Sequence, residues 1–373
     1  MTSKERVTLL LKRQIPDRMG LYESFWPETL RDYWPKQGYP EGYPKLNTQQ
    51  WTSIEAKPEY YFNYDIFNCG GWFDSSFFPG KKDVIEETEQ WQIIKDGNLS
   101  RLKYWKNKSG TPQHMGFEIT TPEKWKQYKE NIIYLNIQRL GDIEAIKADI
   151  VNARLKDKFV VFGNLFIFEL MRGIIGDENF LPALLLESEW IKDFCQTYLD
   201  MFKIHYEYLF KEAGLPDGMF IYEDFGFTNG LFCSPQTMKE LVMPYEKQLV
   251  SFFHDYGLPV ILHSCGDIRK AIPLIIDAGF DCLQPMEAKA GCNVVDIAKE
   301  YGTKISYMGN INVVPLSTND KKKVEQEIVP KIKQLNKMRM PYFFHSDHSI
   351  PPDITLDTYK FALKLYYEYG RYV

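Results

Sequence analysis

Short apolar segments alternate with segments of helical periodicity from about residue 157 onward, and this alternation constrains the fold more than any other feature of the sequence. Six apolar segments are predicted as strands, at residues 159–164, 218–224, 259–263, 281–287, 304–308 and 341–344. Two earlier segments, 19–23 and 61–67, bring the total to eight. Eight strands that alternate with helices fit a closed parallel barrel, and no glycine-rich fingerprint follows the first strand to favour a doubly wound sheet. The sequence therefore predicts an α/β fold, a (β/α)8 TIM-type barrel.

The chain is predicted to be a single barrel domain over residues 1–373 with two additions. A helical pattern in residues 1–18 stops at Pro16 and forms an N-terminal extension. Residues from about 80 to 155 form an insertion after the second strand, in which segments 91–94 and 102–105 flank Asp96 and Gly97. An Asp-Gly pair between two such segments is typical of a β-hairpin.

Aromatic residues make up 15% of the chain and are densest in residues 22–78. Large aromatic side chains dominate protein cores, so ordinary packing is one interpretation and the wall of a binding pocket is the other. In a barrel this stretch contains the loops after the first two strands, at the end where TIM barrels carry their sites. Tyr22, Trp26 and Trp72 are therefore candidate substrate-binding residues.

Charge and cysteine content exclude or disfavour several classes of function. The formal net charge of -5 gives no basic footprint for nucleic acid. The N-terminal segment lacks the apolar stretch of a secretory signal, and no later run approaches the ~18 apolar residues of a membrane span. Six cysteines form no CxxC pair, which favours reduced thiols. We expect a cytoplasmic protein that binds neither nucleic acid nor membrane.

Possible metal ligands stand at the ends of three predicted strands. His263 and Cys265 end the fifth strand one residue apart, so they point to the same side of the chain. Glu287 ends the sixth strand. Closing the barrel brings these ends together, and imidazole, thiolate and carboxylate groups are zinc ligands, although a packed histidine and a buried cysteine would give the same local pattern. A fourth ligand is predicted after the eighth strand, with His348 preferred and Asp347 and His345 as alternatives.

Carboxylates and amides end three further strands. Glu223 and Asp224 follow the fourth strand and, being adjacent, point to opposite sides. Both are candidate catalytic residues: one is expected to face the barrel mouth as a catalytic contact, and the other to accept hydrogen bonds from nearby backbone amides. Asp224 is the preferred choice for the residue at the mouth. Asn164 and Asn310 end the third and seventh strands and are candidate substrate-binding residues. Hydrogen bonding within turns is the alternative role for both amides.

Five segments, in order and over nearly the whole chain, resemble the uroporphyrinogen decarboxylase superfamily. They are ERVTLLLKRQIPDR, EDFGFTNGLFCSPQTMKELVMPYEKQL, HSCGDI, YMGNIN and SDHSIPPD. The resemblance implies a (β/α)8 barrel and one of two chemistries. These are the metal-free decarboxylation of a porphyrinogen and zinc-dependent methyl transfer in concert with a corrinoid protein.

The decarboxylase branch is the less similar of the two. Its members bind substrate carboxylates through an arginine-rich loop, whereas the matching region here offers Glu23, Glu28 and a single arginine, Arg31. Their substrate-binding tyrosine falls on Glu169, which becomes a candidate substrate contact. Asp65, in YFNYDIF, matches their essential aspartate and is therefore a candidate catalytic residue. A decarboxylase of porphyrin biosynthesis stays the alternative function.

The methyltransferase branch binds zinc through an HxC pair, a later glutamate and a cysteine after the last strand. His263, Cys265 and Glu287 match the first three ligands, and the cysteine position falls on His348 or Asp347. The resemblance implies methyl transfer between a corrinoid protein and a small substrate, by demethylation of a methoxylated aromatic or methylamine or by methylation of a thiol. A partner protein must supply the corrinoid (cobalamin), because no corrinoid-binding domain is visible in the sequence. A homodimer is a further expectation from the superfamily.

Overall fold

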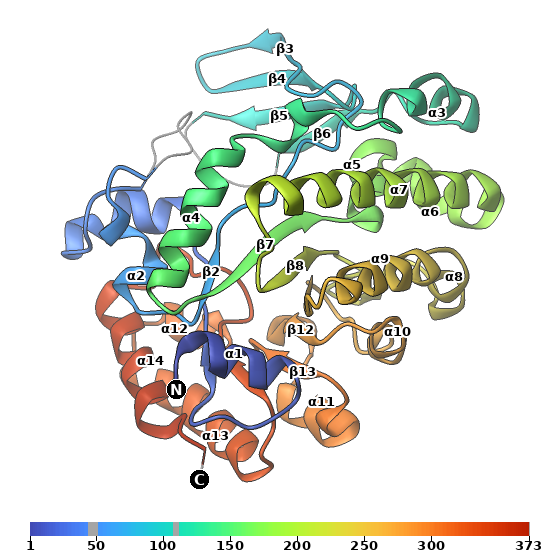
Figure 1. Cartoon of the computed structure of the whole chain (residues 1–373). Coiled ribbons are helices and arrows are strands. Elements are labelled where there is room, and N and C mark those ends of the chain that lie inside the picture. Colours follow the sequence, from blue (N-terminus) through green and yellow to red (C-terminus); the bar gives the residue numbers. More distant parts are fainter. Residues whose placement is uncertain (44–50, 107–111, 373) are drawn as a thin grey trace.

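Eight parallel strands form one sheet in the computed structural model, which describes residues 1–43, 51–106 and 112–372 (Figure 1). The strand order is β1-β14-β13-β12-β11-β8-β7-β2. The strands are β1 (Gly20–Leu21), β2 (Ile66–Asn68), β7 (Phe159–Leu165), β8 (Gly218–Tyr222), β11 (Val260–Ser264), β12 (Cys282–Pro285), β13 (Ser306–Met308) and β14 (Tyr342–Phe344). Each overlaps one of the predicted segments, so the predicted (β/α)8 barrel is confirmed.

Helices cover the outside of this barrel and connect its strands. Their bounds are α1 (Ser3–Leu11), α2 (Pro58–Tyr61), α3 (Pro122–Tyr128), α4 (Ile143–Leu155), α5 (Ile167–Ile175), α6 (Asp177–Leu186), α7 (Ser188–Ala213), α8 (Pro235–Leu241), α9 (Met243–Asp255), α10 (Ile272–Ala278), α11 (Val294–Tyr301), α12 (Val313–Ser317), α13 (Lys321–Lys337) and α14 (Leu356–Tyr369). The barrel strands are almost wholly buried, as strands with both faces covered must be. The helical layer therefore encloses a continuous apolar core.

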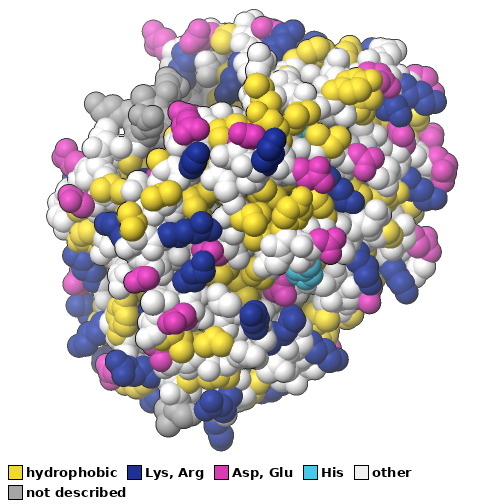
Figure 2. Space-filling view, in the orientation of Figure 1, with side chains coloured by type: hydrophobic (Ala, Val, Ile, Leu, Met, Phe, Trp, Pro, Cys, Tyr) yellow, Lys and Arg dark blue, Asp and Glu magenta, His cyan; other side chains and the backbone are white. Residues whose placement is uncertain are grey.

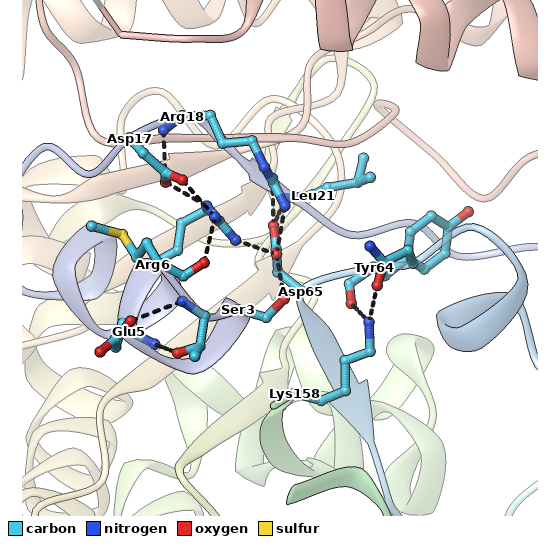
Figure 3. Close-up of polar contacts among 12 residues, drawn as sticks. Ser3, Glu5, Arg6, Asp17, Arg18, Leu21, Tyr64, Asp65 and Lys158 are labelled. Atoms are coloured by element: carbon cyan, nitrogen blue, oxygen red, sulfur yellow. Dashed lines mark hydrogen bonds and ion pairs between the residues drawn. The ribbon is translucent and has the colours of Figure 1, made fainter. Parts of the chain in front are cut away.

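Asp65 closes the barrel between β1 and β2. Its backbone N–H donates to the carbonyl of Leu21 at 2.8 Å, and the N–H of Leu21 donates to the Asp65 carboxylate at 2.8 Å. Arg6 and Arg18 donate to the same buried carboxylate at 2.8–2.9 Å (Figure 3). Lys158 lies beside this cluster and donates to the carbonyl of Tyr64.

Asp65, predicted as a candidate catalytic residue, lies away from the barrel end that carries the other candidate site residues. Asp65 directly precedes β2, and its carbonyl accepts a hydrogen bond from Phe159, the first residue of β7. It therefore lies at the amino-terminal end of the strands, whereas His263 lies at the carboxyl-terminal end of β11. In this fold the amino-terminal end contributes stability and the other end carries the chemistry. The three residues of β2 separate Asp65 from the end of the barrel that carries the candidate ligands.

The insertion after β2 is a second, antiparallel sheet that lies apart from the barrel strands (Figure 1). Its order is β3-β4-β5-β6, with bounds β3 (Lys82–Glu87), β4 (Trp91–Asp96), β5 (Arg101–Trp105) and β6 (Gln113–Gly116). The predicted hairpin segments lie in β4 and β5, where Trp91 pairs with Trp105. The predicted insertion runs to about residue 155 and so includes α4, which packs against β7 and α7 in the helical layer of the barrel.

Most of the aromatic-rich stretch is core. Phe25, Trp34 and Phe62 pack with Tyr359 of α14, at ring-centroid separations of 5.0–5.5 Å between Tyr359 and each of the three. This cluster attaches the loop after β1 to the outside of the barrel. Packing therefore explains the local aromatic density, and the pocket interpretation is left to the few aromatic side chains at the barrel mouth.

The surface shows no single dominant charge on the face in Figure 2, where acidic and basic side chains are interspersed. This distribution is in keeping with the small net charge of -5. No helix within the described ranges is both long enough and apolar enough to cross a membrane.

Candidate metal centre

Three possible metal ligands converge at the carboxyl ends of β8 and β11. The Nε2 atom of His263 lies 3.4 Å from Sγ of Cys265 and 3.7 Å from Oδ1 of Asp224. The three donor atoms all lie within 4.8 Å of one another. The N–H of Cys265 also donates to Oδ1 of Asp224 at 2.8 Å, which fixes the carboxylate beside the thiol.

The strand register explains why Asp224 joins the pair. His263 pairs with Tyr222 across the parallel β11 and β8 strands. Two residues further along each chain, Asp224 therefore lies beside Cys265, on the same side of the sheet as His263. Asp224 was predicted to face the mouth as a catalytic contact, and its position beside His263 and Cys265 makes it a candidate ligand.

This donor set fits zinc. Ligand atoms roughly 2.0–2.3 Å from a tetrahedral zinc lie about 3.5 Å from one another, close to the two separations from His263 Nε2. One imidazole, one thiol and one carboxylate are all zinc ligands, and three protein ligands leave a position for substrate. Among the described residues, the group of close donors is Asp224, His263 and Cys265.

The other predicted ligands lie around this group rather than in it. Glu287 accepts a hydrogen bond from the N–H of Gly266 at 2.9 Å, so its carboxylate borders the loop that carries Cys265. Asp347 accepts from the N–H groups of Val313 and Ala288 at 2.9 and 3.1 Å, and its two oxygens thereby support two neighbouring segments.

His348 and His345 have different surroundings. The ring of His348 stacks on Trp26 with a centroid separation of 5.8 Å and an interplanar angle of 17°. His345 is fully buried, and its Nδ1 donates to the carbonyl of Ser346 at 2.6 Å. His348 thus packs against Trp26 in the loop after β1, whereas His345 is enclosed by the protein.

Gln284, which the sequence analysis missed, connects two of these histidines. Its Oε1 accepts from Nδ1 of His263 at 2.6 Å, and its Nε2 lies 3.3 Å from Nε2 of His345. The pairing of β11 with β12 places Gln284 opposite His263. That register was not available from the sequence, which contains no local motif for the contact.

Burial sets the protonation of these groups. It lowers the pKa of His263, against the attraction of the Asp224 carboxylate, and lowers the pKa of His345 to about 4. Both imidazoles are therefore neutral at neutral pH. Burial, reinforced by the carboxylates of Asp224 and Glu287, raises the pKa of the Cys265 thiol well above its usual value. A bound cation reverses that effect, since metal ligation deprotonates a thiol.

The neighbouring carboxylate of Glu223 points away from the mouth. It is fully buried and accepts from the N–H groups of Phe168 and Glu169 at 2.9 and 2.7 Å, at the start of α5. Burial and the neighbouring Glu246 raise the pKa of Glu223 well above its usual value. Glu223 therefore supports α5 and does not contact the mouth as the catalytic group first considered.

Glu169 lies near the mouth but is paired. Arg172 donates to its carboxylate at 2.8 Å and also contacts Asp177. Burial raises the pKa of Glu169 to about 7, with a smaller contribution from the charge of Asp224. This group can exchange a proton near neutral pH beside the candidate ligands.

An aromatic wall adjoins the candidate ligands. Tyr222 lies with its ring 5.0 Å from that of His263 and 5.1 Å from that of Trp72. Trp72 is 46% exposed, so its indole borders open space. A Cβ atom at Gly163 would come within 2.9 Å of the indole nitrogen, which explains the glycine in β7. Tyr22 is buried behind this wall, with its ring 5.7 Å from that of His345.

The two asparagines predicted to bind substrate have other roles. Asn310 is buried, donates to the carbonyls of Met286 and Cys292, and accepts from Val294, which uses both ends of its amide. Asn164 shares the face of β7 whose Phe162 stacks on Phe210 of α7, so it points at the helical layer. The Asn310 amide is thus engaged within the protein, and Asn164 lies on the face of β7 that packs against α7.

Comparisons with known proteins agree with this architecture. The model of a family described as Uroporphyrinogen decarboxylase (URO-D) matches residues 109–369. A methyltransferase from Methanosarcina mazei is similar in structure over 99% of this chain and 99% of that chain, with 16% sequence identity and a TM-score of 0.68. The YdjI aldolase from Escherichia coli K12 covers 53% of this chain and 68% of its own, with 12% identity and a TM-score of 0.21, and carries no argument. No curated protein matches the sequence significantly. At these identities the structural likeness establishes the fold alone.

Proposed function

The chain belongs to the uroporphyrinogen decarboxylase family, and from that premise we propose that it is a zinc-dependent methyltransferase acting between a small substrate and the corrinoid of a separate protein. The observation that carries the proposal is the convergence of His263, Cys265 and Asp224 within 4.8 Å at the barrel mouth. A metal-free decarboxylase has no need of a thiol and an imidazole aimed at one point. The likeness in fold to a methyltransferase is in keeping with the proposal.

Each of the three residues has a stated part in holding the metal. His263 presents Nε2, because its Nδ1 is engaged by Gln284. Cys265 presents Sγ, and Asp224 is oriented by the N–H of Cys265. Zinc bound there would polarise the oxygen or nitrogen that carries the methyl group, or would hold an acceptor thiol as its thiolate.

The surroundings of the ligands favour an apolar or cationic substrate. Trp72 and Tyr222 offer flat aromatic surfaces beside His263, and such surfaces bind aromatic rings and methylated ammonium groups. Arg172 is already paired with Glu169 and Asp177, so its charge is not free to bind a substrate carboxylate. We therefore propose a methoxylated aromatic or a methylamine as the donor, with a thiol acceptor as the alternative.

The position of Asp65 disfavours the alternative function, a metal-free decarboxylase. It required Asp65 beside the substrate, and Asp65 instead binds Arg6 and Arg18 at the far end of the barrel. We draw the preference for methyl transfer from this placement together with the ligand group.

Metal analysis of the purified protein tests the proposal most directly. We expect about one zinc per chain after purification under reducing, chelator-free conditions, and loss of that zinc in His263→Ala and Cys265→Ala. Cys233→Ala is the matched control, because Cys233 lies outside the ligand group. A wild-type protein that neither retains nor takes up zinc would refute the metal assignment.

Activity is tested with free cob(I)alamin in place of the partner protein. Methoxylated aromatics and methylamines are offered as donors, and methylcob(III)alamin with a thiol tests the opposite direction, with the change in the cobalamin spectrum as the readout. We expect transfer in one of these arms by the zinc-loaded protein and none by Cys265→Ala. Turnover of uroporphyrinogen without metal would instead support the decarboxylase.

A further inference from the structure

The side chain of Gln284 lies between two buried histidines at the floor of the mouth. Gln284 and His345 are 3% and 0% exposed, so neither can exchange its partner for water. The Gln284 amide faces His263 with its oxygen at 2.6 Å and His345 with its nitrogen at 3.3 Å. In this series of hydrogen-bonded side chains, the position of the proton on one group therefore limits where the next group can carry its own.

A backbone carbonyl determines which group donates in each hydrogen bond of this series. The carbonyl of Ser346 can only accept, so Nδ1 of His345 carries the proton of their 2.6 Å hydrogen bond. A neutral His345 then has a lone pair on Nε2, which lies 3.3 Å from the amide nitrogen of Gln284 and 3.4 Å from Oε1 of Glu23. A lone pair repels the amide oxygen, so the end of the Gln284 amide that faces His345 is its N–H2 group. This leaves the amide oxygen toward His263.

The same reasoning fixes His263. The amide oxygen of Gln284 only accepts, so Nδ1 of His263 must carry a proton and Nε2 must carry the lone pair. That lone pair points into the group formed with Cys265 and Asp224. We propose that Gln284 is a positioning residue that locks His263 in the Nδ1–H tautomer and so prepares Nε2 as a metal ligand. The inference deepens the proposed zinc-dependent function and rests on it.

The choice of an amide has a consequence for the metal. Metal-bound histidines commonly donate to a carboxylate or a carbonyl, and the acceptor raises the basicity of the ring. A neutral amide raises it less than a carboxylate does. Gln284 therefore holds His263 in position while leaving a bound zinc more electrophilic than a carboxylate at the same place would.

The tautomer can be measured without metal. In the apo protein labelled with 15N-histidine, we expect the long-range 15N–1H spectrum to show His263 with a protonated Nδ1 and an unprotonated Nε2; the His263→Ala variant assigns the signal. In Gln284→Met, which keeps the volume but removes the acceptor, we expect the Nε2–H tautomer to appear. An Nε2–H tautomer in the wild type, or an unchanged spectrum in Gln284→Met, would overturn the inference.

Zinc affinity gives the second measurement. Competition with a chromophoric chelator should show zinc binding about 10- to 100-fold weaker in Gln284→Met, the usual range for losing the partner of a ligating histidine. Gln248→Met, at an exposed position on α9, should bind like the wild type. Equal affinity in Gln284→Met and the wild type would contradict the positioning role.

A third variant keeps the acceptor that faces His263 and removes the amide N–H that faces His345. Gln284→Glu keeps the size and the acceptor, so His263 should stay in the Nδ1–H tautomer and zinc should bind at least as tightly as in the wild type. A loss as large as that of Gln284→Met would show that an acceptor facing Nδ1 of His263 does not account for tight zinc binding, and would overturn the proposal. If the wild type binds no zinc, the proposed function fails, and the spectrum of the apo protein still decides whether Gln284 sets the tautomer.

Discussion

Glu223 and Asp224 are adjacent in sequence, and their carboxylates serve different parts of the molecule. They follow the last residue of β8, where successive side chains still point to opposite sides. Glu223 is directed outward to the start of α5, and Asp224 is directed to the candidate ligands. One step along the chain thus separates a structural contact from a functional one.

Replacing Asp224 tests its role as a ligand. In Asp224→Asn the amide oxygen can still accept from the N–H of Cys265, but the negative charge that favours a cation is lost. We expect zinc affinity to fall at least tenfold while the free energy of unfolding of the apo protein changes by less than about 1 kcal/mol. Chelator competition and urea unfolding measure the two effects, with Asp296→Asn on the exposed face of α11 as the control. Unchanged zinc affinity would remove Asp224 from the ligand set.

Glu23 carries a buried proton whose loss should be visible in stability. Burial raises the pKa of Glu23 from 4.5 to about 8, although Ser24 and Ser346 donate hydrogen bonds to its carboxylate. The folded state therefore holds a proton that the unfolded chain has already lost above pH 4.5, so stability falls as pH rises toward 8. The pKa of the neighbouring His345, about 4, lies well below the range from pH 6.5 to 8.5.

The variant Glu23→Gln isolates this proton. Over pH 6.5 to 8.5 we expect the free energy of unfolding of the wild type to fall by up to about 2 kcal/mol more than that of Glu23→Gln. The reason is that this range includes about 1.5 pH units below the folded-state pKa of about 8. Urea unfolding of both proteins across the range measures the difference. Parallel stability curves for the two proteins would show that Glu23 is ionised in the folded state.

From the sequence alone we could predict those candidate site residues whose pattern lies within a few neighbouring positions. His263 and Cys265 were found because they end an apolar strand with ligand side chains one residue apart. Gln284 was missed because its role depends on the pairing of β11 with β12, which joins residues far apart in the chain. The predicted second strand, 61–67, begins before β2 (Ile66–Asn68), so Asp65 was expected inside the strand, whereas it directly precedes it.

Asp65 holds β1 and β2 together where the barrel closes. Two arginines and one backbone N–H converge on its fully buried carboxylate. Removing one partner from a buried ion pair leaves uncompensated charge and costs roughly 3–5 kcal/mol. We expect Asp65→Asn to lose stability of that order in urea unfolding while binding zinc with wild-type affinity. Loss of zinc or of methyl transfer with wild-type stability would return Asp65 to the active site.

Sequence periodicity was sufficient to predict the barrel strands and the helices between them. The eight barrel strands could be predicted because each is a short apolar run buried on both faces, between helices with one clear apolar face. Helix α7 is an example, with Phe194, Tyr198 and Phe202 all buried along one side. Strand β3 could not be predicted, because every residue of KDVIEE is exposed and no alternation marks it.

At the scale of the whole molecule, the two ends of the barrel have separate tasks. The amino-terminal end carries α1 and the ion-pair cluster of Asp65, and the carboxyl-terminal end carries the candidate metal centre. The strands between them are packed with apolar side chains, so the centre rests on a rigid support. Disturbing one end should therefore leave the energetics of the other unchanged.

Zinc and Asp65→Asn together test this separation. Zinc binds the folded state, so free zinc at 100 times its dissociation constant should add about 2.7 kcal/mol to the free energy of unfolding, and His263→Ala should gain none. Because the two sites lie at opposite ends and share no partner, we expect the same gain in Asp65→Asn within about 0.5 kcal/mol, although its starting stability is lower. Urea unfolding with buffered free zinc measures all three proteins. A markedly smaller gain in Asp65→Asn would mean that the seam between β1 and β2 helps to shape the metal centre, and that the barrel transmits strain from one end to the other.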